Sequence, residues 1–78
     1  MKSESFIYVD HALERMLERG IPREKIQDAI QNPDSTYPGK AGINRKVIEK
    51  SFQGRILKVI YAEKPEGILV ITAMWKGE

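Results

Sequence analysis

The fold of this chain is decided by residues 45–76, which read RKVIEKSFQGRILKVIYAEKPEGILVITAMWK. β-Branched and aromatic residues, which favour strands, recur in three runs of this stretch: about Arg45 to Phe52, Arg55 to Glu63, and Ile68 to Lys76. The runs are separated by Gln53-Gly54 and by Pro65-Glu66-Gly67, which are typical of tight hairpin turns. The stretch therefore predicts three strands joined as an antiparallel meander.

The last of these runs is apolar on both faces of the strand that it predicts. By simple alternation its side chains fall into two sets: Ile68, Val70 and Met74, and Leu69, Ile71, Ala73 and Trp75. Such a strand belongs in the middle of a sheet. Two short helices can cover only one face of that sheet, so we expect the other face to be partly bare and open to a partner's helix or strand, or to stacked bases.

The first residues of the chain predict a short strand and a helix. Phe6 to Val9 are strand formers, and Asp10 is suited to cap a helix that runs to about Arg19. Gly20 supplies the left-handed residue that ends many helices.

A second helix is expected from Pro22, which suits a first turn, to Asn32-Pro33. Its buried residues are predicted at helical spacing: Ile26, Ala29 and Ile30. Residues 34–42 are rich in Pro, Gly, Asp and Ser and predict a loop with a short strand near Tyr37.

The order of these elements, a short strand, two helices and a hairpin-linked sheet, indicates an α+β fold. We expect two helices packed on one face of a three- to four-stranded antiparallel sheet. At 78 residues the chain is predicted to form a single domain over residues 1–78. The core of so small a domain is thin, which makes a homodimer interface or a tightly bound partner a reasonable expectation.

Composition narrows the chemistry that is available. The chain has no cysteine and one histidine, which excludes disulfides and thiolate zinc sites, so we expect no metal and no cofactor. Its longest apolar run, Ile68 to Trp75, is far shorter than the roughly 20 residues that span a bilayer. No signal peptide is visible, so we expect a cytoplasmic protein without a membrane partner.

Positive charge is concentrated in the second half of the chain. Residues 1–39 hold five Lys/Arg and seven Asp/Glu, whereas residues 40–78 hold eight and four. Glu49 is the one acid among six neighbouring cations: Lys40, Arg45, Lys46, Lys50, Arg55 and Lys58. Such a field favours a polyanion or an acidic protein segment. The alternative is an ordinary solvated sheet surface whose lysines discourage aggregation.

Three of these cations, Arg45, Lys46 and Lys58, are the candidate RNA-binding residues. Arg45 and Lys46 are neighbours on one strand and point to opposite faces, so at most one of them reaches a given site. On the next strand Arg55 and Tyr61 share one face, and Lys58 projects to the other.

Another candidate site lies on the first helix. The buried stripe of this helix is predicted to be Leu13, Met16 and Leu17, and His11 and Arg15 lie on its opposite side, one turn apart. An imidazole and a guanidinium so placed suit one bound phosphate. The alternative is a solvated or capping histidine.

Several short motifs add a family resemblance. They are His11-Ala12, Arg15-Met16, Arg19-Gly20-Ile21, Asn32-Pro33, Gly54-Arg55 with Leu57, Val59 and Tyr61, and Val70-Ile71-Thr72-Ala73. In these motifs the chain resembles a small bacterial domain family of unknown function that is grouped with the RelE/ParE toxin superfamily. The resemblance implies the compact toxin fold, with two N-terminal helices against an antiparallel sheet, and a cognate antitoxin-like protein as partner.

The resemblance also implies a toxin-like, metal-independent ribonuclease that acts on mRNA or ribosome-associated RNA. His11 and Arg15 match the helix motif of the family, and Arg55 and Tyr61 match its strand motif. The hypothesis gives His11 the acid/base role and the two arginines the phosphate-stabilising role. Tyr61 orients the substrate or transfers a second proton. The alternative function is a non-catalytic toxin or binding module, such as a ParE-like inhibitor or an accessory domain, that acts through protein–protein contacts.

Overall fold

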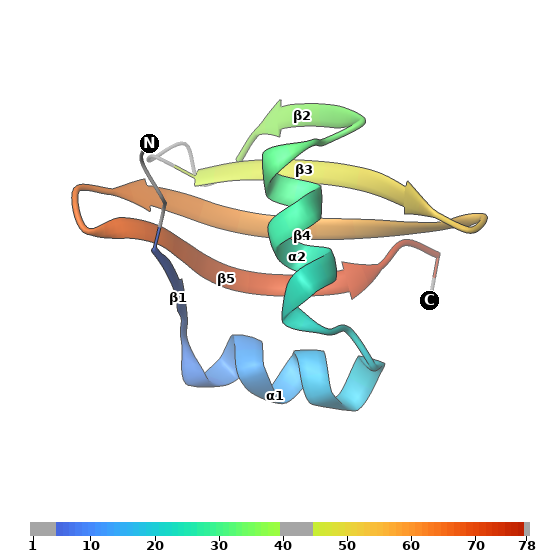
Figure 1. Cartoon of the computed structure of the whole chain (residues 1–78), viewed down its shortest axis with the longest axis horizontal. Coiled ribbons are helices and arrows are strands. Elements are labelled where there is room, and N and C mark those ends of the chain that lie inside the picture. Colours follow the sequence, from blue (N-terminus) through green and yellow to red (C-terminus); the bar gives the residue numbers. More distant parts are fainter. Residues whose placement is uncertain (1–4, 40–44, 78) are drawn as a thin grey trace.

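The structure, a computed structural model, describes residues 5–39 and 45–77. The elements of these residues, in chain order, are β1 (Phe6–Tyr8), α1 (Asp10–Arg19), α2 (Arg23–Gln31), β2 (Ser35–Pro38), β3 (Arg45–Phe52), β4 (Arg55–Lys64) and β5 (Gly67–Trp75). The strands form one sheet in the order β1-β5-β4-β3-β2 (Figure 1). The predicted α+β class and the three long strands are therefore confirmed.

The sheet differs from the prediction in its size and in the direction of one strand. It has five strands rather than three or four, because β2 pairs with β3 and β1 pairs with β5. It is mixed rather than antiparallel, since β1 runs parallel to β5 while the other pairs are antiparallel. These two strands are three and four residues long, and the sequence predicted both as short strands but did not predict which strands they pair with.

The first helix ends as predicted but begins differently. Gly20 is left-handed, with φ 65° and ψ 41°, and the Ile21 N–H donates to the Met16 carbonyl oxygen at 2.9 Å, as in a Schellman stop. Val9 occupies the N-cap position, and no side chain caps this end. Asp10 is therefore not the cap but the first helical residue, where its negative charge interacts favourably with the helix dipole.

The buried stripe of α1 is shifted from the predicted one. Leu17 is 85% exposed, while Ala12 and Met16 are buried. The position of α1 explains the shift, because it lies beside β5 beyond the end of β1 (Figure 1). There the Arg19 guanidinium donates to the Ala73 carbonyl oxygen at 2.8 Å. Only one narrow side of the helix faces the core.

The second helix follows the prediction closely. It begins at Arg23. Pro22, which was expected in the first turn, occupies the N-cap position instead. Its three predicted core residues are all buried: Ile26, Ala29 and Ile30. The helix crosses the strands of one sheet face (Figure 1), where it contacts β3 and β4.

A β-bulge changes the faces of β5. The register shifts between Ile60 and Tyr61 of β4, where the pairing passes over Ile71 of β5. Beyond the bulge the parity of β5 reverses, so Ala73 and Trp75 join the face that carries α2. Simple alternation is wrong here because it assumes a regular strand. The buried residues of β5 on that face are Ile68, Val70, Ala73 and Trp75.

The core lies between the helices and one face of the sheet, as expected. A single cluster of buried residues joins both helices to β3, β4 and β5. We call the opposite side of the sheet the helix-free face. Its side chains alternate with those of the core and include Val47 and Glu49 of β3, Lys58 and Ile60 of β4, and Leu69 and Met74 of β5. Two of its apolar residues, Val47 and Ala62, are buried yet lie outside the core cluster.

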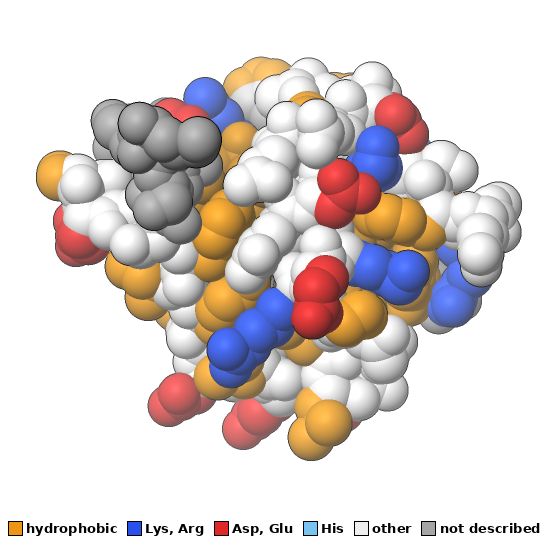
Figure 2. Space-filling view, in the orientation of Figure 1, with side chains coloured by type: hydrophobic (Ala, Val, Ile, Leu, Met, Phe, Trp, Pro, Cys, Tyr) orange, Lys and Arg blue, Asp and Glu red, His pale blue; other side chains and the backbone are white. Residues whose placement is uncertain are grey.

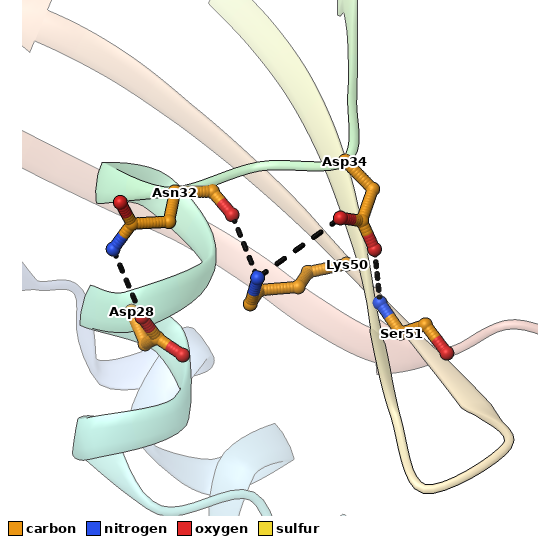
Figure 3. Close-up of polar contacts among 5 residues, drawn as sticks. All are labelled: Asp28, Asn32, Asp34, Lys50 and Ser51. Atoms are coloured by element: carbon orange, nitrogen blue, oxygen red, sulfur yellow. Dashed lines mark hydrogen bonds and ion pairs between the residues drawn. The ribbon is translucent and has the colours of Figure 1, made fainter.

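Polar contacts join the end of α2 and the residues after it to β3 (Figure 3). The Lys50 ammonium donates to the Asn32 carbonyl oxygen at 2.9 Å and lies 4.0 Å from Asp34 Oδ1. Asp34 Oδ2 accepts the backbone N–H of Ser51 at 2.8 Å, and the Asn32 amide donates to Asp28. These bonds fix the point at which the chain turns from α2 into β2.

In the part of the chain that the structure describes, no helix is long and apolar enough to cross a membrane.

Candidate functional site

The helix site predicted from the sequence is exposed and partly engaged. His11 is exposed on the first turn of α1, and Arg15 lies one turn later on the same side. The Arg15 guanidinium is 3.1 Å from Glu18 Oε1, with side chains that are 33% and 60% exposed. The structure therefore keeps the predicted neighbours together, and it shows Glu18 as a competitor for any phosphate bound by Arg15.

The two predicted residues of β4 lie far apart. Arg55 and Tyr61 point to the same face, as expected, but six residues of strand separate their Cα atoms by about 20 Å. The Arg55 guanidinium carbon is 4.0 Å from the centroid of the Trp75 ring, and Tyr61 is only 5% exposed in the core cluster. The Trp75 indole N–H in turn donates to the Arg19 carbonyl oxygen at 3.0 Å. Arg55 thus lies by the C-terminal end of α1, whereas Tyr61 is beneath the helices, and the two do not share a site.

His11 also lies away from Arg55. Trp75 brings Arg55 to the Arg19 end of α1, and eight residues of helix place His11 about 12 Å from Arg19 along the axis. The structure therefore does not gather the four predicted catalytic residues around one phosphate.

Three predicted RNA-binding cations divide between the faces of the sheet. Lys46 pairs with Tyr61 in the sheet register, on the helix side, and its ammonium is 3.3 Å from Glu63 Oε1. Arg45 and Lys58 lie on the helix-free face. The expectation that Arg45 and Lys46 point to opposite faces is confirmed, and Arg45 is the one that joins Lys58.

Arg45 and Lys58 line a hollow of about 380 Å³ on the helix-free face. A volume of this size lies in the range of small-ligand pockets. Alternate residues of three adjacent strands build it, and they include Tyr37 of β2, Arg45, Val47 and Glu49 of β3, and Lys58 and Ile60 of β4. We call this feature the β2–β4 hollow.

Glu49 is the one buried charged residue among those that the structure describes. One of its oxygens, Oε1, accepts a hydrogen bond from the Tyr37 hydroxyl at 3.4 Å and lies 3.3 Å from the Lys76 ammonium. Sequence reasoning did not select Glu49 as a site residue. The available signal was its position as the lone acid in a run of cations, at the same strand parity as Arg45.

The cations of the hollow differ from their neighbours in having no partner among the described residues. In residues 5–39 and 45–77 the side chains of Arg45 and Lys58 form no hydrogen bond or ion pair. Lys46 and Lys50, in contrast, are engaged by acids. On the face that carries α2, acidic and basic side chains are interspersed (Figure 2). Lys46 and Lys50 therefore fit the alternative of an ordinary solvated sheet surface. Arg45 and Lys58 do not, and they make the β2–β4 hollow locally positive. Lys40 lies outside the described residues.

No group of three His, Cys, Asp or Glu side chains that could hold a metal ion occurs within the described ranges.

A comparison with known protein families identifies the family of this domain. The profile of the domain of unknown function DUF4258 matches residues 8–75. The chain belongs to the DUF4258 family. The match covers both helices, the four strands β2 to β5 and every residue of the β2–β4 hollow named above, so the hollow lies within the DUF4258 domain itself. No curated protein and no solved structure matches the chain. The predicted membership of a small family of unknown function is thus confirmed.

Proposed function

We propose that this DUF4258 protein is a toxin-like ribonuclease that binds single-stranded RNA in the β2–β4 hollow. The observation that carries the proposal is the presence in a hollow on the helix-free face of two cations, Arg45 and Lys58, whose side chains are paired with no described residue. Phosphate contacts supply most of the affinity of proteins for nucleic acids, and such contacts need cations that are not already neutralised.

The hollow also offers surfaces for a base. The Tyr37 side chain is 43% exposed at its rim, and Val47 and Ile60 supply apolar surface. Aromatic stacking tolerates any base and adds about 1–3 kcal/mol per base. Two cations beside an aromatic ring and an apolar floor are the combination used to bind single strands without strict sequence preference.

The grouping with the RelE/ParE toxins belongs to the same proposal. It is supported by the two helices packed on one face of the sheet, which leave the other face for RNA. A cytoplasmic location and a cognate antitoxin-like partner follow from this grouping as further parts of the proposal.

The binding proposal is tested by fluorescence anisotropy with a labelled single-stranded RNA of mixed sequence. We expect Arg45→Ala and Lys58→Ala each to weaken binding about tenfold, because each removes a charge-assisted contact of at least 1.4 kcal/mol. Lys46→Ala is the matched control, since Lys46 is next to Arg45 in sequence, lies on the helix side and is paired with Glu63. Equal loss in all three variants, or loss in none, would contradict the proposed site.

A protein-docking function is the second candidate, and the other half of the helix-free face favours it. Ile7 of β1 is 39% exposed and pairs in register with Leu69 of β5, which is half-buried. A contiguous apolar strip at a sheet edge suits a partner's strand or helix. Expression in bacteria separates the candidates: growth arrest with transcript cleavage supports the ribonuclease, arrest with a DNA-damage response supports a ParE-like inhibitor, and no effect supports an accessory domain.

A further inference from the structure

Glu49 has one carboxylate oxygen that is engaged and one that is not. Its Oε1 contacts both the Tyr37 hydroxyl and the Lys76 ammonium, whereas no described residue donates to Oε2. The described part of the chain contains no buried side-chain oxygen or nitrogen without a partner. Oε2 is therefore open to solvent, and Glu49 is one of the residues that line the β2–β4 hollow.

The carboxylate is also held in place. Its side chain is 11% exposed, and its two contacts come from β2 and from the residue after β5, on opposite sides of β3 in the sheet. A carboxylate that is oriented through one oxygen and open at the other can accept a proton from a bound ligand.

Lys58 lies directly across from Glu49 in the pairing of β3 with β4. Cα atoms of residues so paired are about 4.5–5.5 Å apart, and both side chains project to the same face. A proton acceptor and a proton donor thus flank one point in the hollow, with the Arg45 guanidinium on the same wall.

We infer that Glu49 is the general base of an RNA-cleaving site in the β2–β4 hollow, an inference that rests on the proposed binding of RNA there. Glu49 Oε2 takes the proton of a ribose 2′-hydroxyl, and the 2′-oxygen forms a bond to the adjacent phosphorus. The bond from phosphorus to the 5′-oxygen breaks, and that oxygen takes a proton from the Lys58 ammonium. The products are a 2′,3′-cyclic phosphate and a 5′-hydroxyl, and exchange with water returns both side chains to their starting states.

Arg45 completes the chemistry without transferring a proton. Negative charge grows on the non-bridging oxygens as the 2′-oxygen attacks, and a guanidinium on the same wall stabilises it. No metal ion takes part in these steps. These steps use side chains of Glu49, Arg45 and Lys58, so His11 is not required.

The test compares wild type with Glu49→Gln on an end-labelled single-stranded RNA, with cleavage and anisotropy measured on the same samples. We expect wild type to release fragments that end in 2′,3′-cyclic phosphate. Glu49→Gln should cleave about 10²- to 10⁴-fold more slowly, which is the usual contribution of a general base, and should still bind RNA. Glu63→Gln is the matched control because it makes the same change on the helix side, where Glu63 contacts Lys46, and it should cleave like wild type.

A second substrate tests the same step without any change to the protein. A strand of the same sequence with 2′-deoxyribose throughout should bind to the wild-type protein but should not be cut, because it lacks the attacking hydroxyl. Cleavage of the deoxy strand, or equal cleavage by wild type and Glu49→Gln, overturns the role of Glu49. Wild-type protein that binds RNA in the hollow and leaves it intact also overturns that role, while the binding proposal stands. If the wild-type protein does not bind RNA, both the role of Glu49 and the binding proposal are overturned.

Discussion

Lys58 lies directly opposite Glu49 in the register of β4 and β3, yet the Glu49 carboxylate is bonded to Tyr37 and Lys76 instead. The consequence is an ammonium group that faces the β2–β4 hollow with no acid committed to it among the described residues. Lys58 is therefore open to a bound anion and is not part of a surface ion pair with Glu49.

Reversal of the charge at Lys58 should be costly to the fold as well as to binding. In Lys58→Glu two carboxylates face each other across the strands, and like charges in that position are destabilising. We expect the free energy of unfolding to fall by about 1 kcal/mol at low salt and part of the loss to be recovered at high salt. Urea denaturation at two salt concentrations measures this. Lys58→Gln is the control and should lose less stability, with little dependence on salt.

The contact between β5 and the end of α1 should contribute measurably to stability. Trp75→Phe keeps an aromatic ring but removes the N–H that donates to the Arg19 carbonyl oxygen at 3.0 Å. We expect the free energy of unfolding to fall by about 1–3 kcal/mol, since a part-buried carbonyl loses its donor. Thermal or urea denaturation gives the value, and a change of less than a few tenths of a kcal/mol would contradict the placement of α1.

Two adjacent residues of α1 should respond very differently to truncation. Met16 is 5% exposed and Leu17 is 85% exposed. Met16→Ala should lower the free energy of unfolding by about 2–5 kcal/mol because it leaves a cavity in the core. Leu17→Ala should change it by less than about 0.5 kcal/mol. If Leu17→Ala is the more damaging change, then α1 packs through the stripe that the sequence predicts rather than the one in the structure.

Much of the fold could be predicted because its signals are local. The turns at Gly20 and Gln53-Gly54 mark where elements end, and the apolar spacing of α2 marks which side is buried. What escaped prediction depends on distant pairing. The short strand at β1 was predicted, but its parallel pairing with β5 was not, and the bulge at Ile71 reverses a face that alternation alone cannot reverse.

The site could be predicted only in part, for a similar reason. The run of cations pointed to Arg45 and Lys58, and strand parity put them on one face. Glu49 was hidden because its partners, Tyr37 and Lys76, are 12 and 27 residues away in the chain. Parity also placed Arg55 with Tyr61 correctly on one face, but the six residues of strand between them, about 20 Å, already rule out a shared site.

Binding of RNA in the β2–β4 hollow is tested by methyl NMR spectra recorded during titration with single-stranded RNA. Val47 and Ile60 line the hollow, while Ile48 and Val59, their neighbours along the same strands, are fully buried on the other face. We predict that the methyl signals of Val47 and Ile60 shift on addition of RNA and that those of Ile48 and Val59 change little. Shifts confined to the methyl signals of α1, such as that of Ala12 beside His11, with no change in the signals of Val47 and Ile60, would contradict binding of RNA in the hollow.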